Sequence, residues 1–210
     1  MSGIPGAIAR LTLVGAITIL LRPAPAYAHL VTTGLGPLYD GLAHFALTPE
    51  DFVPALALSL LAGLRGPSHS RRVLFVLPTM WLLAAVLGFM TPNAANALPK
   101  SMALATSISF VLLGALLAAD AKMPRPVMAA IAALLGVLHG YLNGATMSQA
   151  ALGATAVIGI ATAVFTLVAL ASSTVVPLRA AWARIAIRIA GSWIAATGLL
   201  LIGWSLRSTS

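Results

Sequence analysis

Two pairs of polar side chains with the same spacing could bind a metal ion. Asp40 and His44 are four residues apart in the chain, and so are His139 and Asn143. In a helix, this spacing places both members of a pair on one face. A carboxylate oxygen and an imidazole nitrogen on one face provide half of a site for a divalent first-row metal. For the first pair, the alternative is a hydrogen bond that only orients an interfacial helix.

His29 offers a third imidazole if the chain is cleaved after Ala28, because the free α-amine and the ring of one residue can chelate a metal together. A terminus without a role is the alternative. His69 stands beside Arg71 and Arg72, and we expect it to be solvated. The predicted metal site comprises Asp40, His44 and His139, with Asn143 and His29 at its edge.

The composition requires that these residues be positioned by helices in a membrane. Of the 210 residues, 60% are hydrophobic and only 8% are charged, whereas a soluble domain carries about 25% charged residues. The chain has no cysteine, which excludes disulfides and thiolate metal sites. The formal charge of +8 is dispersed between apolar blocks, without the basic stripe of a nucleic-acid-binding protein. The predicted fold class is an all-α, polytopic membrane helix bundle.

Residues 1–28 have the pattern of a removable signal peptide. Arg10 precedes an apolar run at 11–21, and Ala26-Tyr27-Ala28 provides the small residues of a cleavage site. The run is shorter than the ~20 residues that a membrane span needs. An uncleaved short anchor is the alternative, and Arg22 close to the run favours it. We expect residues 29–210 to form a single transmembrane domain.

Six apolar segments follow, separated by prolines and polar residues. The first begins at Thr48-Pro49-Glu50-Asp51, in which Thr48 can cap a helix and two acids lie at its positive end. The predicted spans are residues 49–64, 73–90, 102–119, 127–142, 150–172 and 187–206.

Basic residues predict the orientation of these spans, because Lys and Arg gather in cytoplasmic loops. With the mature N-terminus outside, only Lys100 and Arg207 lie on the outer side. The cytoplasmic set is Arg65, Arg71, Arg72, Lys122, Arg125, Arg179, Arg184 and Arg188. We therefore expect a bacterial inner-membrane protein whose mature N-terminus is periplasmic. Both polar pairs then fall on the periplasmic side. The similar sequences around the two pairs could mark two related three-helix halves, a common plan for transporters, or could arise by chance.

Three stretches resemble the HupE/UreJ family of membrane proteins: residues 36–44 (GPLYDGLAH), 48–51 (TPED) and 60–63 (LLAG). The family pattern has an Asp and a His before the first span and His-Gly-x-x-His-Gly in the fourth. The resemblance implies uptake of nickel or cobalt alongside hydrogenase and urease. This chain departs from the pattern at Asn143, where the family's second His usually stands, and no Glu follows Gly144.

These observations favour a permease or facilitator for nickel or cobalt, with a His/Asp site that faces the periplasm. The alternative is a non-transporting accessory subunit for metalloenzyme assembly or cofactor binding. We expect no enzyme, because no Gly-x-Ser-Gly stands in a span and Ser192 has no base nearby in sequence. We expect no tightly bound cofactor, with Ni²⁺ or Co²⁺ as cargo. The expected partners are the lipid bilayer and a divalent metal ion but no nucleic acid, while a homo-oligomer and metalloenzyme maturation proteins stay open.

Overall fold

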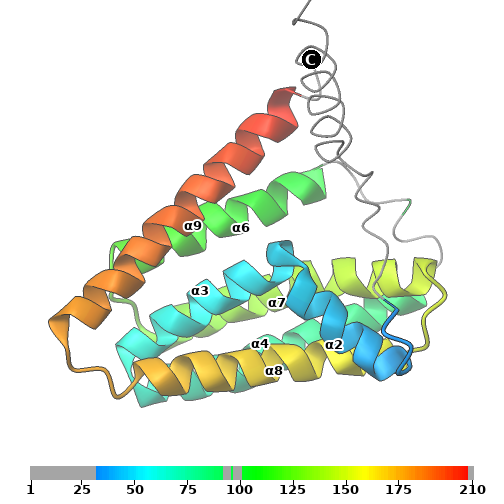
Figure 1. The fold of residues 1–210 in the computed structure, drawn as a ribbon, viewed down its shortest axis with the longest axis horizontal. Coiled ribbons are helices and arrows are strands. Elements are labelled where there is room, and N and C mark those ends of the chain that lie inside the picture. The colour runs from blue at the N-terminus through cyan, green and yellow to red at the C-terminus, as the bar shows by residue number, and fades with distance from the viewer. Residues whose placement is uncertain (1–31, 92–95, 97–100, 208–210) are drawn as a thin grey trace, which may run out of the picture. The chain divides into compact units, whose positions relative to one another are not determined.

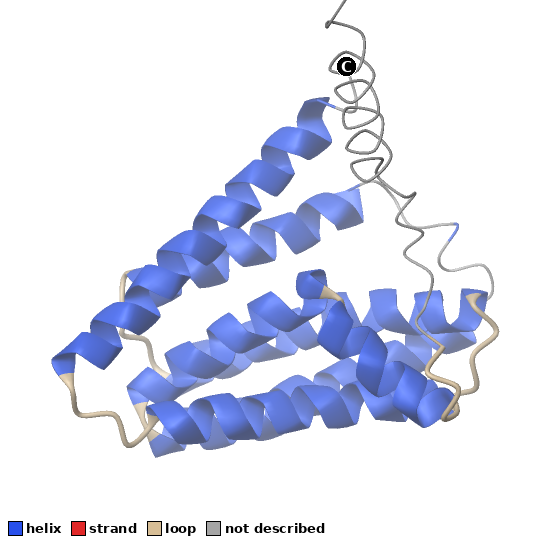
Figure 2. Ribbon diagram, viewed as in Figure 1, coloured by secondary structure: helices blue, strands red, loops and turns tan. Residues whose placement is uncertain are grey.

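The computed structural model describes residues 32–91, 96 and 101–207, and these residues form helices without any strand (Figure 2). The predicted all-α helix bundle is therefore confirmed. The predicted signal peptide and His29 lie outside the described residues. The helices are α2 (Pro37–Leu47), α3 (Pro49–Arg65), α4 (Pro67–Met90), α6 (Ser101–Ala118), α7 (Arg125–Gln149), α8 (Thr155–Val175) and α9 (Ala181–Arg207).

Among the described residues, five helices are long and apolar enough to cross a membrane: α4, α6, α7, α8 and α9. A sixth span results if α2 and α3 are counted together, although the pair is bent by 72° at Thr48. Thr48 occupies the position before α3 but makes no side-chain cap. The expectation of about six spans thus agrees with the structure only if the first of them is a broken helix.

Helix α7 lies against α4 through a row of glycines. A Cβ atom on Gly136, Gly140 or Gly144 would overlap a backbone carbonyl of α4. In lipid, small residues at this spacing let two helix backbones approach closely. These glycines fix the position of His139 and Asn143 relative to α4.

Helix α2 is held against α8 in the same way. A Cβ atom on Gly41 would overlap the carbonyl of Ala156, and one on Gly159 would overlap the carbonyl of Leu38. In Figure 1, α3 begins part-way along α4 and α7, and α2 leads into it at an angle. The break between α2 and α3 therefore lies beside the middle part of the longer helices.

One end of the bundle is joined by ionic contacts. Asp120, in the α6–α7 loop, accepts hydrogen bonds from Arg65 at the end of α3 and from Arg184 at the start of α9, the latter at 3.0 Å. His69 Nε2 lies 3.2 Å from the carbonyl oxygen of Met123. The expectation of a merely solvated His69 was wrong, because its ring joins the start of α4 to this loop.

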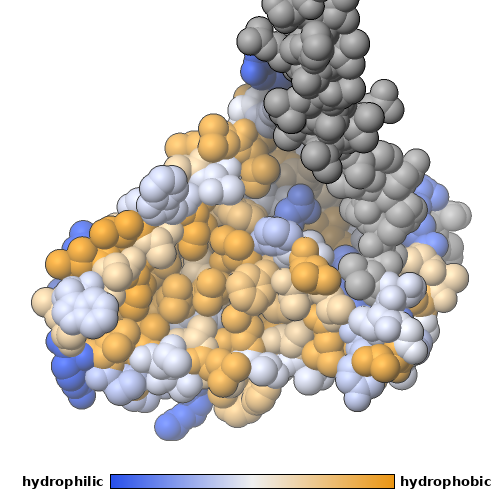
Figure 3. Space-filling model, viewed as in Figure 1, coloured by the Kyte–Doolittle hydropathy of each residue, from blue (hydrophilic) through white to orange (hydrophobic). Residues whose placement is uncertain are grey.

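Apolar side chains cover much of the outer surface, and the most hydrophilic residues gather chiefly toward the edges of the view (Figure 3). Helix α9 is the extreme case, since only 11% of its most apolar 18-residue stretch is buried inside the protein. Such a surface suits contact with acyl chains rather than with water. The chain is accordingly a membrane protein.

Candidate functional site

The carboxylate of Asp51 lies at the centre of a polar network inside the bundle. Asp51 belongs to the first turn of α3 and is only 4% exposed. Its Oδ1 lies 2.8 Å from His139 Nδ1, and its Oδ2 accepts a hydrogen bond of 2.8 Å from Asn143 Nδ2. Since an ionised carboxylate can only accept, Nδ1 of His139 carries the proton in this contact. Residues 139 and 143 thus share one helix face, as their spacing predicts, and both contact Asp51.

Trp81 of α4 fixes the orientation of Asn143. Its indole Nε1 donates a hydrogen bond of 3.4 Å to Asn143 Oδ1. An indole N–H cannot accept, so the oxygen of the amide must point to Trp81 and the nitrogen to Asp51. Both polar ends of Asn143 are therefore engaged within the protein.

His139 is sealed from solvent, with 0% exposure. Ser109 of α6 places its Oγ 3.3 Å from His139 Nε2 and also donates to the carbonyl of Thr106 at 2.6 Å. The Trp81 ring packs beside the imidazole, with ring centroids 5.4 Å apart. Contacts from α3, α4 and α6 therefore hold this ring in one orientation.

His44 of α2 places a second imidazole near Asp51. Its Nε2 lies 4.0 Å from Asp51 Oδ2, which is too long for a direct hydrogen bond. The His44 side chain is 15% exposed and is more accessible than those of Asp51 and His139. Phe45 secures this part of α2 by packing against Phe52 and edge-on against Trp81, at centroid distances of 5.9 and 5.7 Å. Helix α2 thereby brings a second, more accessible imidazole close to the buried carboxylate.

The site lies well inside the bundle. His139 is fourteen residues from the start of α7 and ten from its end, or about 21 and 15 Å at 1.5 Å per residue. The sequence placed His139 near the outer end of a span that finishes at residue 142, but α7 continues to Gln149. The break between α2 and α3 falls at this depth, and interrupted helices of this kind form ion and substrate sites in transporters.

Asp40 has different partners from those that its spacing suggests. Its Oδ1 accepts hydrogen bonds from the backbone N–H and the hydroxyl of Thr33, at 2.6 and 2.7 Å. Asp40 thus fastens the segment that precedes α2, one turn away from His44. In the described part of the chain, no group of three or more His, Cys, Asp or Glu side chains is arranged to hold a metal ion. His29 cannot be placed, because it lies outside the described residues.

The chain matches the model of one protein family, described as HupE / UreJ protein, over residues 17–201. This chain belongs to the HupE/UreJ family. The family is associated with nickel and cobalt transport or with accessory roles, and it is not a known enzyme family. Comparison with curated proteins and with solved structures found no match.

Asp51 is the site residue that sequence reasoning missed in this HupE/UreJ protein. Its position in the first helical turn had a sufficient local explanation, namely attraction to the helix dipole. A signal was present, because the chain has only four acidic residues and two of them, Glu50 and Asp51, lie in the first turn of a predicted span. An ionisable residue in such a place is a functional candidate by default.

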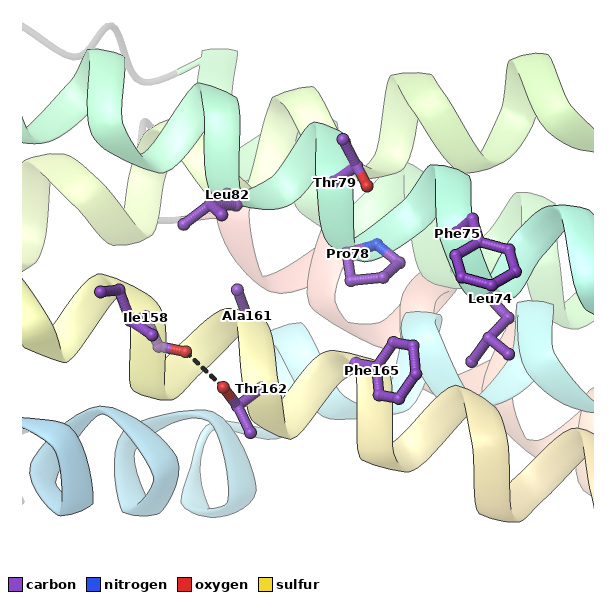
Figure 4. A pocket seen from close by; sticks show the side chains of 9 residues that line it. All are labelled: Leu74, Phe75, Pro78, Thr79, Leu82, Ile158, Ala161, Thr162 and Phe165. Carbon is purple, nitrogen blue, oxygen red and sulfur yellow. Dashed lines mark hydrogen bonds between the residues drawn. The ribbon is translucent and has the colours of Figure 1, made fainter.

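The structure also contains an open groove of about 270 Å³ between α4 and α8 (Figure 4). The only hydrogen bond drawn there joins the Thr162 hydroxyl to the carbonyl of Ile158, at 2.8 Å. Its lining has no titratable group and is Leu74, Phe75, Pro78, Thr79, Leu82, Ile158, Ala161, Thr162 and Phe165. This groove therefore offers a cation no charged ligand, unlike the surroundings of Asp51.

Proposed function

We propose that this HupE/UreJ protein is a permease or facilitator for a divalent transition metal, nickel or cobalt, and that the ion binds between His44 and Asp51. The single observation that carries the proposal is a buried carboxylate that bonds to one imidazole and lies 4.0 Å from a second, at the break of an interrupted helix. Buried charges of this kind mark ion pathways in membrane proteins.

The distance between the two proposed ligands supports an ion between them. Metal bonds to imidazole nitrogen and to carboxylate oxygen are each about 2.0–2.2 Å long. Their sum is the separation of two ligands on opposite sides of an ion, and it is close to the 4.0 Å between His44 Nε2 and Asp51 Oδ2. Ligands in adjacent positions would lie closer together. A small rotation of either side chain would bring both atoms onto one ion. Imidazole and carboxylate together suit nickel and cobalt.

His139 and Asn143 act as positioning residues in this proposal. Each binds one oxygen of the Asp51 carboxylate, at 2.8 Å. Hydrogen bonds of this kind around a ligand orient it and tune its affinity. With few charged ligands, the site would hold the ion weakly enough for release, as transport requires.

Asp40 and His29 stay candidates for the path by which the ion reaches the site. Asp40 lies one helical turn before His44, and His29 belongs to the preceding segment. The orientation inferred from the basic residues makes this the periplasmic side. No stretch of the sequence resembles a nucleotide-binding loop. We therefore propose that the ion crosses passively or by coupling to another ion.

The test is uptake of Ni²⁺ and Co²⁺ by proteoliposomes that contain the full chain. We expect His44→Ala and Asp51→Asn to abolish saturable uptake. The matched control is His69→Ala, which removes an imidazole that contacts Met123 in the α6–α7 loop, at one end of the bundle. Uptake by both site variants at the parental rate would refute the proposal. Metal binding without flux would instead favour the accessory role in metalloenzyme assembly.

A further inference from the structure

A second groove, also of about 270 Å³, lies where the end of α6 meets the first half of α9. It is lined by Ala118, Ile185, Arg188, Ile189 and Ser192. The two helices pack side by side (Figure 1). Arg188 Nε donates a hydrogen bond of 2.9 Å to the carbonyl of Ala118, the last residue of α6. This bond uses one of the five N–H groups of a guanidinium, and Arg188 stays exposed.

The neighbours of Arg188 indicate that it faces lipid. Ile185 and Ile189 are 54% and 53% exposed, and Trp182 is 75% exposed. A charged side chain among lipid-facing residues is costly unless it reaches a polar partner. The groove therefore places a cation beside side chains that are expected to face acyl chains.

Two tryptophans indicate the depth of Arg188. Trp182 and Trp204 are both 75% exposed and are 22 residues apart on α9, about 33 Å along the helix. That length matches the ~30 Å of a hydrocarbon core, with a tryptophan at each interface. Arg188 lies six residues beyond Trp182, about 9 Å deeper. From there, its side chain can extend toward the headgroup layer.

This end of the bundle has a large excess of positive charge. Its described helix ends and loops contain eight basic residues and one acid, a formal charge of +7. The acid is Asp120, which is already bonded to Arg65 and Arg184. An anion from outside the chain is therefore the complementary partner for Arg188. Basic pockets between helices bind anionic lipid headgroups on the cytoplasmic side of membranes.

We propose that this groove binds one anionic phospholipid, whose phosphate contacts Arg188 and whose acyl chain lies along Ile185 and Ile189. The lipid would bridge α6 and α9, because Arg188 belongs to α9 and bonds to the end of α6. Arg184, one turn nearer the helix start and 39% exposed, is not part of the lining and already bonds to Asp120. This inference concerns a lipid site and is independent of the proposed metal transport.

The experiment measures lipids retained by the full chain after purification in mild detergent, by native mass spectrometry with phosphatidylglycerol or phosphatidylcholine added. We expect the parent to retain phosphatidylglycerol and not phosphatidylcholine. Arg188→Ala should lower the retained fraction at least tenfold. The matched control is Arg72→Ala, which removes an exposed charge at the same end, outside the groove. Equal loss in both variants would mean that general charge attraction holds the lipid, and would overturn the site.

A second variant keeps the proposal testable if Arg188→Ala does not fold. Ile189→Trp fills the groove without changing any charge, and it should also abolish retention. Displacement of the lipid by inorganic phosphate alone would indicate a site for a free anion and refute a lipid site. A dimer that forms without lipid and is lost in Arg188→Ala would assign the groove to a second copy of the chain, which also contradicts the proposal.

Discussion

Asp51→Asn is the substitution that best separates the proposed metal site from the rest of the fold. It keeps the shape of the side chain and removes its charge. The new amide can donate to His139 Nδ1 if the ring proton moves to Nε2, where Ser109 Oγ lies 3.3 Å away. The amide oxygen can still accept from Asn143, whose orientation Trp81 fixes. The network thus survives with one charge-assisted bond weakened, at a cost of about 1–3 kcal/mol.

The expected effect on metal binding is larger. Two unit charges 4 Å apart interact by about 4 kcal/mol at an effective dielectric constant of 20. An ion of charge +2 bonded directly to Asp51, at about 2 Å, interacts with the carboxylate more strongly than this. Desolvation of the ion and the carboxylate cancels part of the gain. We expect a net loss of about 3 kcal/mol, or roughly a hundredfold weaker binding.

Calorimetric titration with Ni²⁺ and Co²⁺ of full-length protein in detergent measures this loss. The matched control is Asp40→Asn, which removes another buried carboxylate whose Oδ1 is bonded to Thr33. We expect the control to change affinity by less than about fivefold, equivalent to about 1 kcal/mol. Parental affinity in Asp51→Asn, or an equal loss in both variants, would refute the assignment of Asp51 as the principal charged ligand.

Three further predictions concern packing and charge. In Gly144→Val the new side chain would overlap a carbonyl of α4, and the substitution should lower thermal stability by about 1–3 kcal/mol. Gly203→Val is the control, because its side chain meets open space and should change stability little. Equal melting temperatures of the two variants would contradict the close packing. Asp120→Asn leaves the guanidinium of Arg65, which is only 9% exposed, without an anion. The free energy of unfolding should fall by about 1–3 kcal/mol. An unchanged melting temperature would show that the ion pair is unimportant for stability. Asn143→His adds an imidazole beside Asp51 and should tighten nickel binding in the same titration, whereas weaker binding would show that the amide is needed.

The sequence predicted the helices well because hydrophobic length and proline positions are local signals. It did not predict that α7 continues to Gln149. A polar residue followed by a glycine, as in Asn143-Gly144, is typical of the end of a span. In the structure, however, both polar groups of Asn143 are hydrogen-bonded inside the protein, and Gly144 lets the backbone of α4 approach closely. Polar residues can lie at membrane depth when the protein itself satisfies them. Composition alone cannot distinguish that case from a loop.

The site was predictable only in part, for the same reason. The pairing of His139 with Asn143 follows from helical spacing, whereas their contacts with Asp51 join residues 88 and 92 positions apart. Spacing in one helix carries no information about such contacts. It also made Asp40 the natural partner of His44, although the hydrogen bonds of Asp40 go to Thr33.

The break at Thr48 connects these observations. An unbroken helix would place residues 44 and 51 nearly two turns apart along one axis, about 10 Å from each other. The 72° bend instead brings His44 Nε2 within 4.0 Å of Asp51 Oδ2. Gly41 and Gly159 make that bend possible, because they let α2 lie directly on the backbone of α8. A larger residue at position 41 should therefore displace His44 and weaken metal binding while leaving the contacts of Asp51 with α7 in place.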